Sequence, residues 1–153
     1  MRVFLFGLAA LLAACGSSDD STGGSSGNAH AALAQQCVDR INELRAGQGL
    51  SPYARWTDKE ACANGQAESD SQTKTAHGAF GDCSENAQNE CPGYPSTSSV
   101  IGTCLDQMWA EGPGADFKTH GHYINMSSTK YTKVACGFYV TAGGDVWAVQ
   151  DFR

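Results

Sequence analysis

The stretch KVACGFYVTAGGDVWAVQDF, residues 133–152, carries the clearest structural pattern of the chain. Apolar side chains occupy every second position of its first half, and a second alternating run covers residues 146–152. Gly143 and Gly144 lie between the two runs, where a tight reversal favours glycine. Alternation, a glycine turn and renewed alternation predict an antiparallel hairpin. The alternating positions of the first run are Val134, Cys136, Phe138 and Val140.

Upstream of this hairpin the apolar spacing is that of helices. Residues 33–44 place Leu, Cys, Ile and Leu at intervals of three or four, which predicts one buried helix face. A second helix is expected after Trp56, where Thr57 and Glu60 fit a capping box. A third is expected after Pro95, capped by Ser96 or Thr97. Its buried side would carry Ile101, Leu105, Met108 and Trp109.

The order of these elements predicts the fold class. Helices come first and a hairpin last, which is typical of an α+β domain built in layers. Residues 73–95, rich in Gly, Ser, Asn and Pro, are expected to form a long loop. We place one domain at residues 29–153, a length that suits a single core. The net charge of −6 and the lack of a basic stripe exclude nucleic acid as an expected partner.

The N-terminus has the form of an export signal. Met1-Arg2 precedes an apolar run that ends in Leu12-Ala13-Ala14-Cys15, and this run is too short to span a membrane. The ending resembles a bacterial lipobox, so we expect residues 1–14 to be a signal peptide and Cys15 to be lipidated. The alternative is an ordinary signal that leaves Cys15 as a free thiol. The next residue is Gly16, as in lipoproteins that are retained in the outer membrane. We therefore expect an outer-membrane lipoprotein, exposed at the cell surface or in the periplasm.

The segment that follows Cys15 is expected to be a tether. Residues 15–28 contain no large apolar side chain, so ordering them would gain little. Together with acyl chains on Cys15, such a linker would hold the domain at a membrane.

Seven cysteines are an odd number, and setting Cys15 aside leaves six. An even set in an exported chain is typical of a disulfide framework. Six cysteines allow fifteen pairings, and the sequence alone does not choose among them. As a working hypothesis we take the pairs Cys37–Cys62, Cys83–Cys91 and Cys104–Cys136.

Four residues are candidates for a metal or catalytic site: His77, Glu85, Glu111 and His122. Two imidazoles with two carboxylates can bind zinc and orient a bound water. The His-Glu-x-x-His pattern of zinc peptidases is absent, so only the fold could bring the four together. His120 would share a face with His122 if this segment is extended, and so is a possible third ligand or competitor.

Four short motifs follow one another along the chain: INELR at residues 41–45, SENA at 84–87 after His77, WAE at 109–111 and GHYINM at 121–126. In this order they resemble the CAP superfamily, which comprises cysteine-rich secretory proteins, insect antigen 5 and plant pathogenesis-related proteins. The resemblance covers about residues 29–153, and the closing VWAVQDF fits the bacterial branch. Ser84 and Ile124-Asn125 depart from the family pattern.

The resemblance implies both a fold and a site. The fold is a three-layer α-β-α sandwich around a central antiparallel sheet, with a strand expected near residues 122–126. The site is a cavity formed by the four candidates, in which His77 and His122 hold zinc or another divalent metal.

Three functions remain open from the sequence. The first is a lipid-anchored binding module whose ligand is an unidentified small molecule, lipid or protein. The second is a zinc-dependent peptidase or esterase with Glu85 or Glu111 as general base. The third is structural, a buried hydrogen-bonded network that orders the loops.

Overall fold

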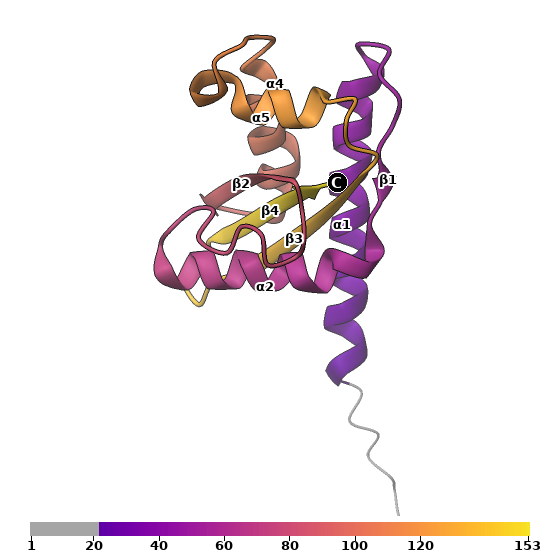
Figure 1. Ribbon diagram of the computed structural model, residues 1–153. Helices are drawn as coiled ribbons and strands as arrows, with labels where there is room; N and C mark the ends of the chain where they lie inside the picture. Colours follow the sequence, from indigo (N-terminus) through magenta and orange to yellow (C-terminus); the bar gives the residue numbers. More distant parts are fainter. Residues whose placement is uncertain (1–21) are drawn as a thin grey trace, which may run out of the picture.

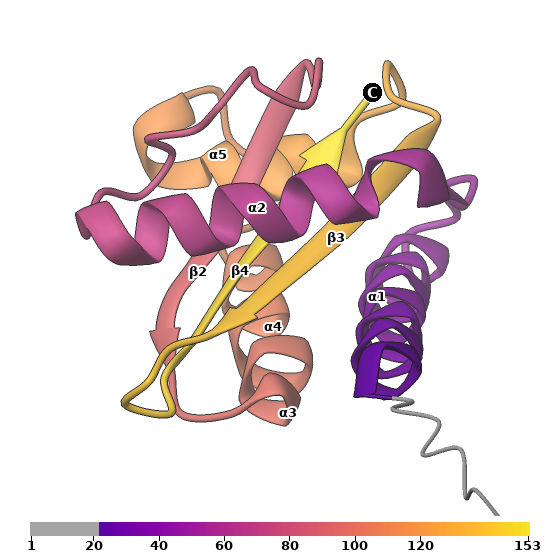
Figure 2. The ribbon, with the colours of Figure 1, turned by 90° about the horizontal axis from the view of Figure 1, so that it is seen from below.

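The computed structural model describes residues 22–153, which form a four-stranded sheet between layers of helices (Figures 1 and 2). The strand order is β1-β3-β4-β2, and β2 and β4 are antiparallel. The short β1 runs parallel to β3, so the sheet is mixed rather than wholly antiparallel. The strands are β1 (Ala54–Arg55), β2 (Ala87–Tyr94), β3 (Lys133–Val140) and β4 (Val146–Phe152).

The predicted hairpin is confirmed as β3 and β4, which pair antiparallel from Val134↔Phe152 to Val140↔Val146. Gly144 in the connecting turn has a φ of +92°, a backbone conformation that glycine adopts without strain. The alternation of residues 133–152 thus reflects a real division between the two faces of the sheet.

Helices cover both faces, which confirms the α+β class and the layered sandwich. One helix, α2, lies across one face, while α1 and α4 pack on the other (Figures 1 and 2). No helix of residues 22–153 combines the length and the apolar character needed to cross a bilayer. The helices are α1 (Thr22–Ala46), α2 (Thr57–Thr73), α3 (Thr97–Ser99), the π-helical turn η1 (Val100–Cys104), α4 (Leu105–Ala110) and α5 (Phe117–Ser127).

The main core lies on the face covered by α1 and α4, which we call the apolar side. Cys37 and Ile41 are fully buried there, as the helix spacing of residues 33–44 predicted, and Phe138 and Phe152 of the hairpin meet them. On the α2 face the packing is closer. A Cβ at Gly137 would lie 2.1 Å from the backbone carbon of Ala63, so only glycine lets α2 approach β3 this closely.

Helix boundaries differ from the predictions at two places. The first helix begins at Thr22 rather than near Ala29, so the second half of the predicted tether is helical. The capping box is wrong: Trp56 is the N-cap of α2 and makes no side-chain cap bond. The Glu60 carboxylate instead binds Arg55, at 2.5 Å from Nε and 2.7 Å from Nη2. A charged guanidinium outcompetes a backbone amide for this carboxylate.

Two extended or irregular segments were also assigned wrongly. The expected loop of residues 73–95 contains β2, an edge strand whose polar side chains hid its alternation. The strand expected near residues 122–126 is instead part of helix α5. Asp116 caps this helix by accepting a bond from the Lys118 amide at 3.0 Å, a signal that alternation alone does not reveal.

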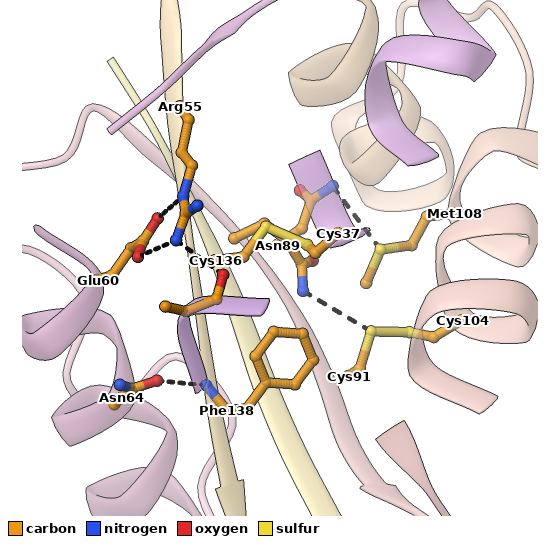
Figure 3. Close-up of a disulfide and its surroundings, with 12 residues drawn as sticks. Cys37, Arg55, Glu60, Asn64, Asn89, Cys91, Cys104, Met108, Cys136 and Phe138 are labelled. Atoms are coloured by element: carbon orange, nitrogen blue, oxygen red, sulfur yellow. Dashed lines mark hydrogen bonds and ion pairs between the residues drawn. A yellow bond between two sulfur atoms is a disulfide. The ribbon is translucent and has the colours of Figure 1, made fainter. Parts of the chain in front are cut away.

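All three hypothetical disulfide pairs are wrong. Cys37 and Cys62 lie on opposite sides of the sheet, because α1 packs against β3 on the apolar side while α2 covers the other face. Cys83 is carried back to α2 by its loop, so it does not pair with its sequence neighbour Cys91. Figure 3 shows two of the bridges around β3. The bridges present are Cys37–Cys136, Cys62–Cys83 and Cys91–Cys104.

Candidate functional site

The two candidate histidines reach the same place from different elements. The outer edge of β2 is not paired with another strand in the described part of the chain. His77 lies in the loop between α2 and β2, and His122 lies on α5. Both line one small pocket of about 90 Å³, together with Gln88 and Asn125. Two histidines that are 45 positions apart in sequence therefore line one pocket beside the edge strand β2.

The His122 ring is held directly by Glu111, which follows α4. Its Nδ1 lies 2.5 Å from Glu111 Oε1. The other oxygen, Oε2, accepts from the backbone amides of His122 at 3.0 Å and Tyr123 at 3.3 Å. Because a carboxylate holding two amide donors acts as an acceptor, the proton of the neutral ring lies on Nδ1. Nε2 then carries the lone pair.

The His77 ring is hydrogen-bonded by an amide, and the nearest carboxylate oxygen, Glu90 Oε2, lies farther off at 3.8 Å from Nδ1. Its Nδ1 lies 2.9 Å from Gln88 Oε1, and its backbone amide donates to Glu90 Oε2 at 2.5 Å. The residue has a φ of +60°, a conformation that few non-glycine residues adopt. Such conformations persist where surrounding contacts impose them, often at functional sites.

Glu85 lies behind this pocket rather than in it. Its side chain is buried, and Oε1 accepts from Gln66 Nε2 at 2.7 Å and from the Gly81 amide at 2.5 Å. Gln66 in turn contacts Gln88, so Glu85 reaches His77 only through two glutamines. Of the four candidates, Glu111 and His122 are in contact, His77 shares their side of the sheet edge, and Glu85 is one layer removed.

Three further buried carboxyl groups were not identified from the sequence: those of Asp70, Glu90 and Asp151. Burial raises the pKa of Glu90 to about 7 and that of Asp151 to about 7, and it also raises the pKa of Asp70. Polar residues at alternate positions 88 and 90 were the available signal, had β2 been recognised as a strand. We call the set Gln66, Asp70, Glu85, Gln88, Glu90 and Asp151 the polar cluster.

Each acid of the polar cluster has one oxygen hydrogen-bonded and one without a partner in the described structure. For Asp70, Oδ1 accepts from the Ala79 amide at 2.9 Å, and for Asp151, Oδ1 accepts from Gln88 Nε2 at 3.0 Å. Four carboxyl groups this close and this buried cannot all be ionised at low cost. The oxygens without a partner are Asp70 Oδ2, Glu85 Oε2, Glu90 Oε1 and Asp151 Oδ2.

The positions of the potential ligand atoms limit which residues could bind a metal ion together. Within residues 22–153, one trio of ligand atoms lies within 4.8 Å of one another, from Cys83, Glu85 and Asp151. Cys83 is bound in a disulfide to Cys62, so its sulfur is not a thiolate ligand. No trio within residues 22–153 includes His77 or His122, so a metal at the shared pocket would have the two imidazoles as its main protein ligands.

His120 is not a competitor for the pocket. On a helix, residues two positions apart point in nearly opposite directions, so the predicted shared face with His122 does not exist. His120 Nδ1 instead lies 2.8 Å from the carbonyl oxygen of Glu111 and 3.0 Å from that of Gly112. The ring packs so closely on Gly114 that a Cβ there would lie 2.1 Å from it. It thus fastens the α4–α5 connection.

The helix layers around the sheet and the three bridges define a disulfide-rich α+β domain, and such bridges are typical of oxidising, extracytoplasmic compartments. The family model described as the cysteine-rich secretory protein family, CAP, matches residues 38–152. The chain belongs to this family.

Comparisons with individual proteins add little. No curated protein matches the chain. Among solved structures, the venom allergen-like protein 4 of Schistosoma mansoni is similar, with a TM-score of 0.47 and 11% sequence identity. The alignment covers 82% of this chain and 85% of that one.

Proposed function

We propose that this chain is an exported, lipid-anchored binding module that holds a divalent metal ion, zinc by the chemistry of the donors, between His77 and His122. The bound ligand is a small molecule, lipid or protein that coordinates to or docks beside this ion. The proposal extends the family membership to a site and a chemistry.

One observation carries the metal proposal. His77 and His122 line the same pocket, and each ring has its Nδ1 bound to an acceptor oxygen. Zinc ligation by histidine commonly has this form, with one nitrogen on the metal and the other donating to an oxygen that orients the ring. Both rings thus support ligation through Nε2. When bound, zinc would supply a Lewis acid with open positions for a ligand.

Binding is favoured over the alternative, a zinc-dependent hydrolase. A general base must stand within hydrogen-bonding reach of the water it activates. Glu85 is buried behind the glutamines, and Glu111 already accepts from His122 and two backbone amides. Neither carboxylate of the hydrolase hypothesis is thus left to act as a base beside the two imidazoles.

The lipid anchor rests on the cysteine pairing. Cys15 and residues 1–14 lie outside the described residues. The six cysteines of the folded domain pair with one another, so they provide no partner for Cys15. Growth with an alkyne-bearing fatty acid, followed by mass spectrometry of the mature N-terminal peptide, tests the anchor. The label should be on Cys15 and be lost in Cys15→Ser; an unlabelled wild-type chain would refute it.

Calorimetry tests the metal site. The chain carrying Cys15→Ser, purified from the periplasm with its disulfides formed, is titrated with zinc and compared with the His77→Ala/His122→Ala variant. We expect zinc binding that weakens at least tenfold in the double variant and that also weakens at acid pH, because protons compete for imidazole. The control is His30→Ala, which removes a histidine of α1 that does not line the pocket with His77 and His122. Equal affinities in the wild-type chain and the double variant would rule out the site.

A further inference from the structure

Two buried glutamines connect His77 to the backbone of its own loop. Gln66 of α2 and Gln88 of β2 are only 2% and 7% exposed. Every polar atom of these two side chains has a hydrogen-bond partner in the described structure. The direction of each bond can therefore be followed from one end of the chain of contacts to the other.

The orientation of the Gln66 amide is fixed by groups that only accept. Its Nε2 lies 2.9 Å from the carbonyl oxygen of Ala79 and 2.7 Å from Glu85 Oε1. A backbone carbonyl has no proton to give, so this end of the amide must be the NH₂ group. The Gln66 oxygen consequently faces Gln88.

The orientation of the Gln88 amide follows. Its Nε2 lies 3.1 Å from Gln66 Oε1 and 3.0 Å from Asp151 Oδ1. Two acceptors at one end require the NH₂ group there, which leaves Gln88 Oε1 at 2.9 Å from His77 Nδ1. An amide oxygen only accepts, so Nδ1 must donate. A neutral imidazole has a single N–H, and Nε2 is then the bare nitrogen.

We infer that Gln66 and Gln88 form a positioning relay that sets the tautomer of His77, with the Ala79 carbonyl and the Asp151 carboxyl as its anchors. In the described structure Gln66 and Asp151 form hydrogen bonds to Gln88 and none to His77, so they act through the Gln88 amide. His122 reaches the same tautomer by a direct bond to Glu111. The tautomer of His77 is independent of the proposed function. Only the role of the Nε2 lone pair as a metal ligand rests on that proposal.

The test is the proton position on His77 in the metal-free protein. Long-range ¹⁵N–¹H correlation spectra of the chelator-treated chain, recorded near pH 8.5 where free imidazole is neutral, distinguish Nδ1–H from Nε2–H. We expect His77 to carry its proton on Nδ1. A proton on Nε2, or an even mixture, in the wild-type chain would overturn the relay.

Two sets of variants separate the relay from simple packing. Gln88→Met removes the acceptor and should shift the tautomer ratio of His77 by about fivefold, the worth of one hydrogen bond. Gln88→Glu keeps an acceptor and should retain Nδ1–H. Gln66→Met/Asp151→Asn frees the Gln88 amide to turn, so Nε2–H should appear although neither residue touches the ring. Unchanged His77 spectra in both Gln88→Met and this double variant would refute the relay.

Control measurements distinguish a loss of the relay from a loss of folding and from a loss of zinc binding. His122 should keep its spectrum in every variant, because its partner is Glu111, and it reports an intact fold. Gln72→Met alters an exposed glutamine of the same helix and should leave His77 unchanged. If the tautomer behaves as expected but zinc does not bind, the proposed function fails and the relay stands. If zinc binds but the tautomer ignores Gln88, only the relay fails.

Discussion

The apolar side of the sheet and the polar cluster are equally closed to solvent, yet they are filled with opposite kinds of side chain. Ile41 and Phe152 are 0% exposed on the first, and Asp70 and Asp151 are 0% exposed in the second. Burial of apolar area stabilises a fold in proportion to the area removed from water. Burial of carboxyl groups costs free energy unless partners or protons compensate it. The first region therefore supplies stability, and the second uses part of it.

This difference also bears on the proposed site. Within the polar cluster, the Gln66 and Gln88 amides have a partner at every polar atom, which fixes the direction of each amide. The polar cluster borders the pocket with His77, and the disulfide Cys62–Cys83 closes the loop that carries this histidine. The apolar side holds the other two bridges and most of the core. Perturbing each region should thus produce distinct losses, of stability in one and of site geometry in the other.

The largest expected effect is on stability, from removing the bridge that spans the apolar side. Cys37 and Cys136 are separated by 99 residues, whereas Cys62 and Cys83 are separated by 21. By loop-closure entropy, losing the first bridge should cost about 5 kcal/mol and losing the second about 3 kcal/mol. Chemical denaturation of Cys37→Ala/Cys136→Ala and Cys62→Ala/Cys83→Ala measures both.

The same two variants should rank in the opposite order in their effect on zinc affinity and on the His77 tautomer. Without Cys62–Cys83 the His77 loop is free of its covalent tie to α2, so zinc affinity and the His77 tautomer should both change. Without Cys37–Cys136 they should persist wherever the protein remains folded. Unaltered zinc affinity in Cys62→Ala/Cys83→Ala would contradict this division of roles between the two regions.

The next effect comes from emptying the apolar side itself. Phe138 is 1% exposed, and Phe138→Ala removes its ring from the core on β3. We expect a loss of about 3–5 kcal/mol in the free energy of unfolding. Val140→Ala is the matched control, since this side chain on the same strand is 53% exposed and its loss should change stability by less than about 0.5 kcal/mol. Similar losses in the two variants would contradict the assigned core.

A smaller effect, in pH dependence, belongs to the polar cluster. Burial raises the pKa of Asp151 from 3.8 to about 7 in the folded chain. Between these values the unfolded chain has lost a proton that the folded chain keeps, so this contribution to stability falls as pH rises from about 4 to 7. The slope is at most about 1.4 kcal/mol per pH unit for one group.

The measurement is the difference in stability between the wild-type chain and Asp151→Asn across that pH range. Asparagine cannot ionise, so the variant should lose less stability than the wild type as pH rises. Asp145→Asn, in the exposed turn of the hairpin, should follow the wild-type curve. Parallel curves for wild type and Asp151→Asn would show that Asp151 is ionised in the fold.

Regular apolar patterns predicted the fold well, and the reason is local. Alternation in residues 133–152 and helix spacing in residues 33–44 depend only on which face meets the core. The edge strand β2 escaped because its buried face is polar. Asp116 capping put α5 where the family resemblance implied a strand. In both cases the interaction that determined the structure was polar, or it involved residues outside the segment itself.

The site was predictable only in part. Motif resemblance gave His77, Glu111 and His122, and the structure places them at pockets along β2; their chemical role stays a prediction. Gln88 and Asp151 were missed because their roles depend on cross-strand pairing, Gln88↔Asp151, that no sequence spacing reveals. The disulfide pairs failed for the same reason: they join elements whose neighbours are set by the tertiary fold.

Arg45 shows how misleading a charged residue can be. Although charged, its side chain is 2% exposed and donates to the carbonyl oxygens of Ser51, Met126 and Ser128. Its guanidinium also stacks 3.6 Å from the centre of the Tyr53 ring. Charge alone therefore does not mark the boundary between the apolar side and solvent.

The smallest expected effect tests whether surface charge helps to hold the apolar side closed. Arg40, five positions before Arg45 on α1, lies at the rim and pairs with Asp106 of α4 at 2.6 Å and with Glu43 at 2.9 Å. Exposed pairs of this kind contribute about 0.2–1 kcal/mol and are screened by salt. Arg40→Met should therefore lower the free energy of unfolding by less than about 1 kcal/mol, and the difference should vanish in concentrated salt, as denaturation at two ionic strengths would show. A loss that is larger and insensitive to salt would mean that this ion pair, and not only apolar burial, fastens α1 to α4, and the contrast between the two regions would have to be redrawn.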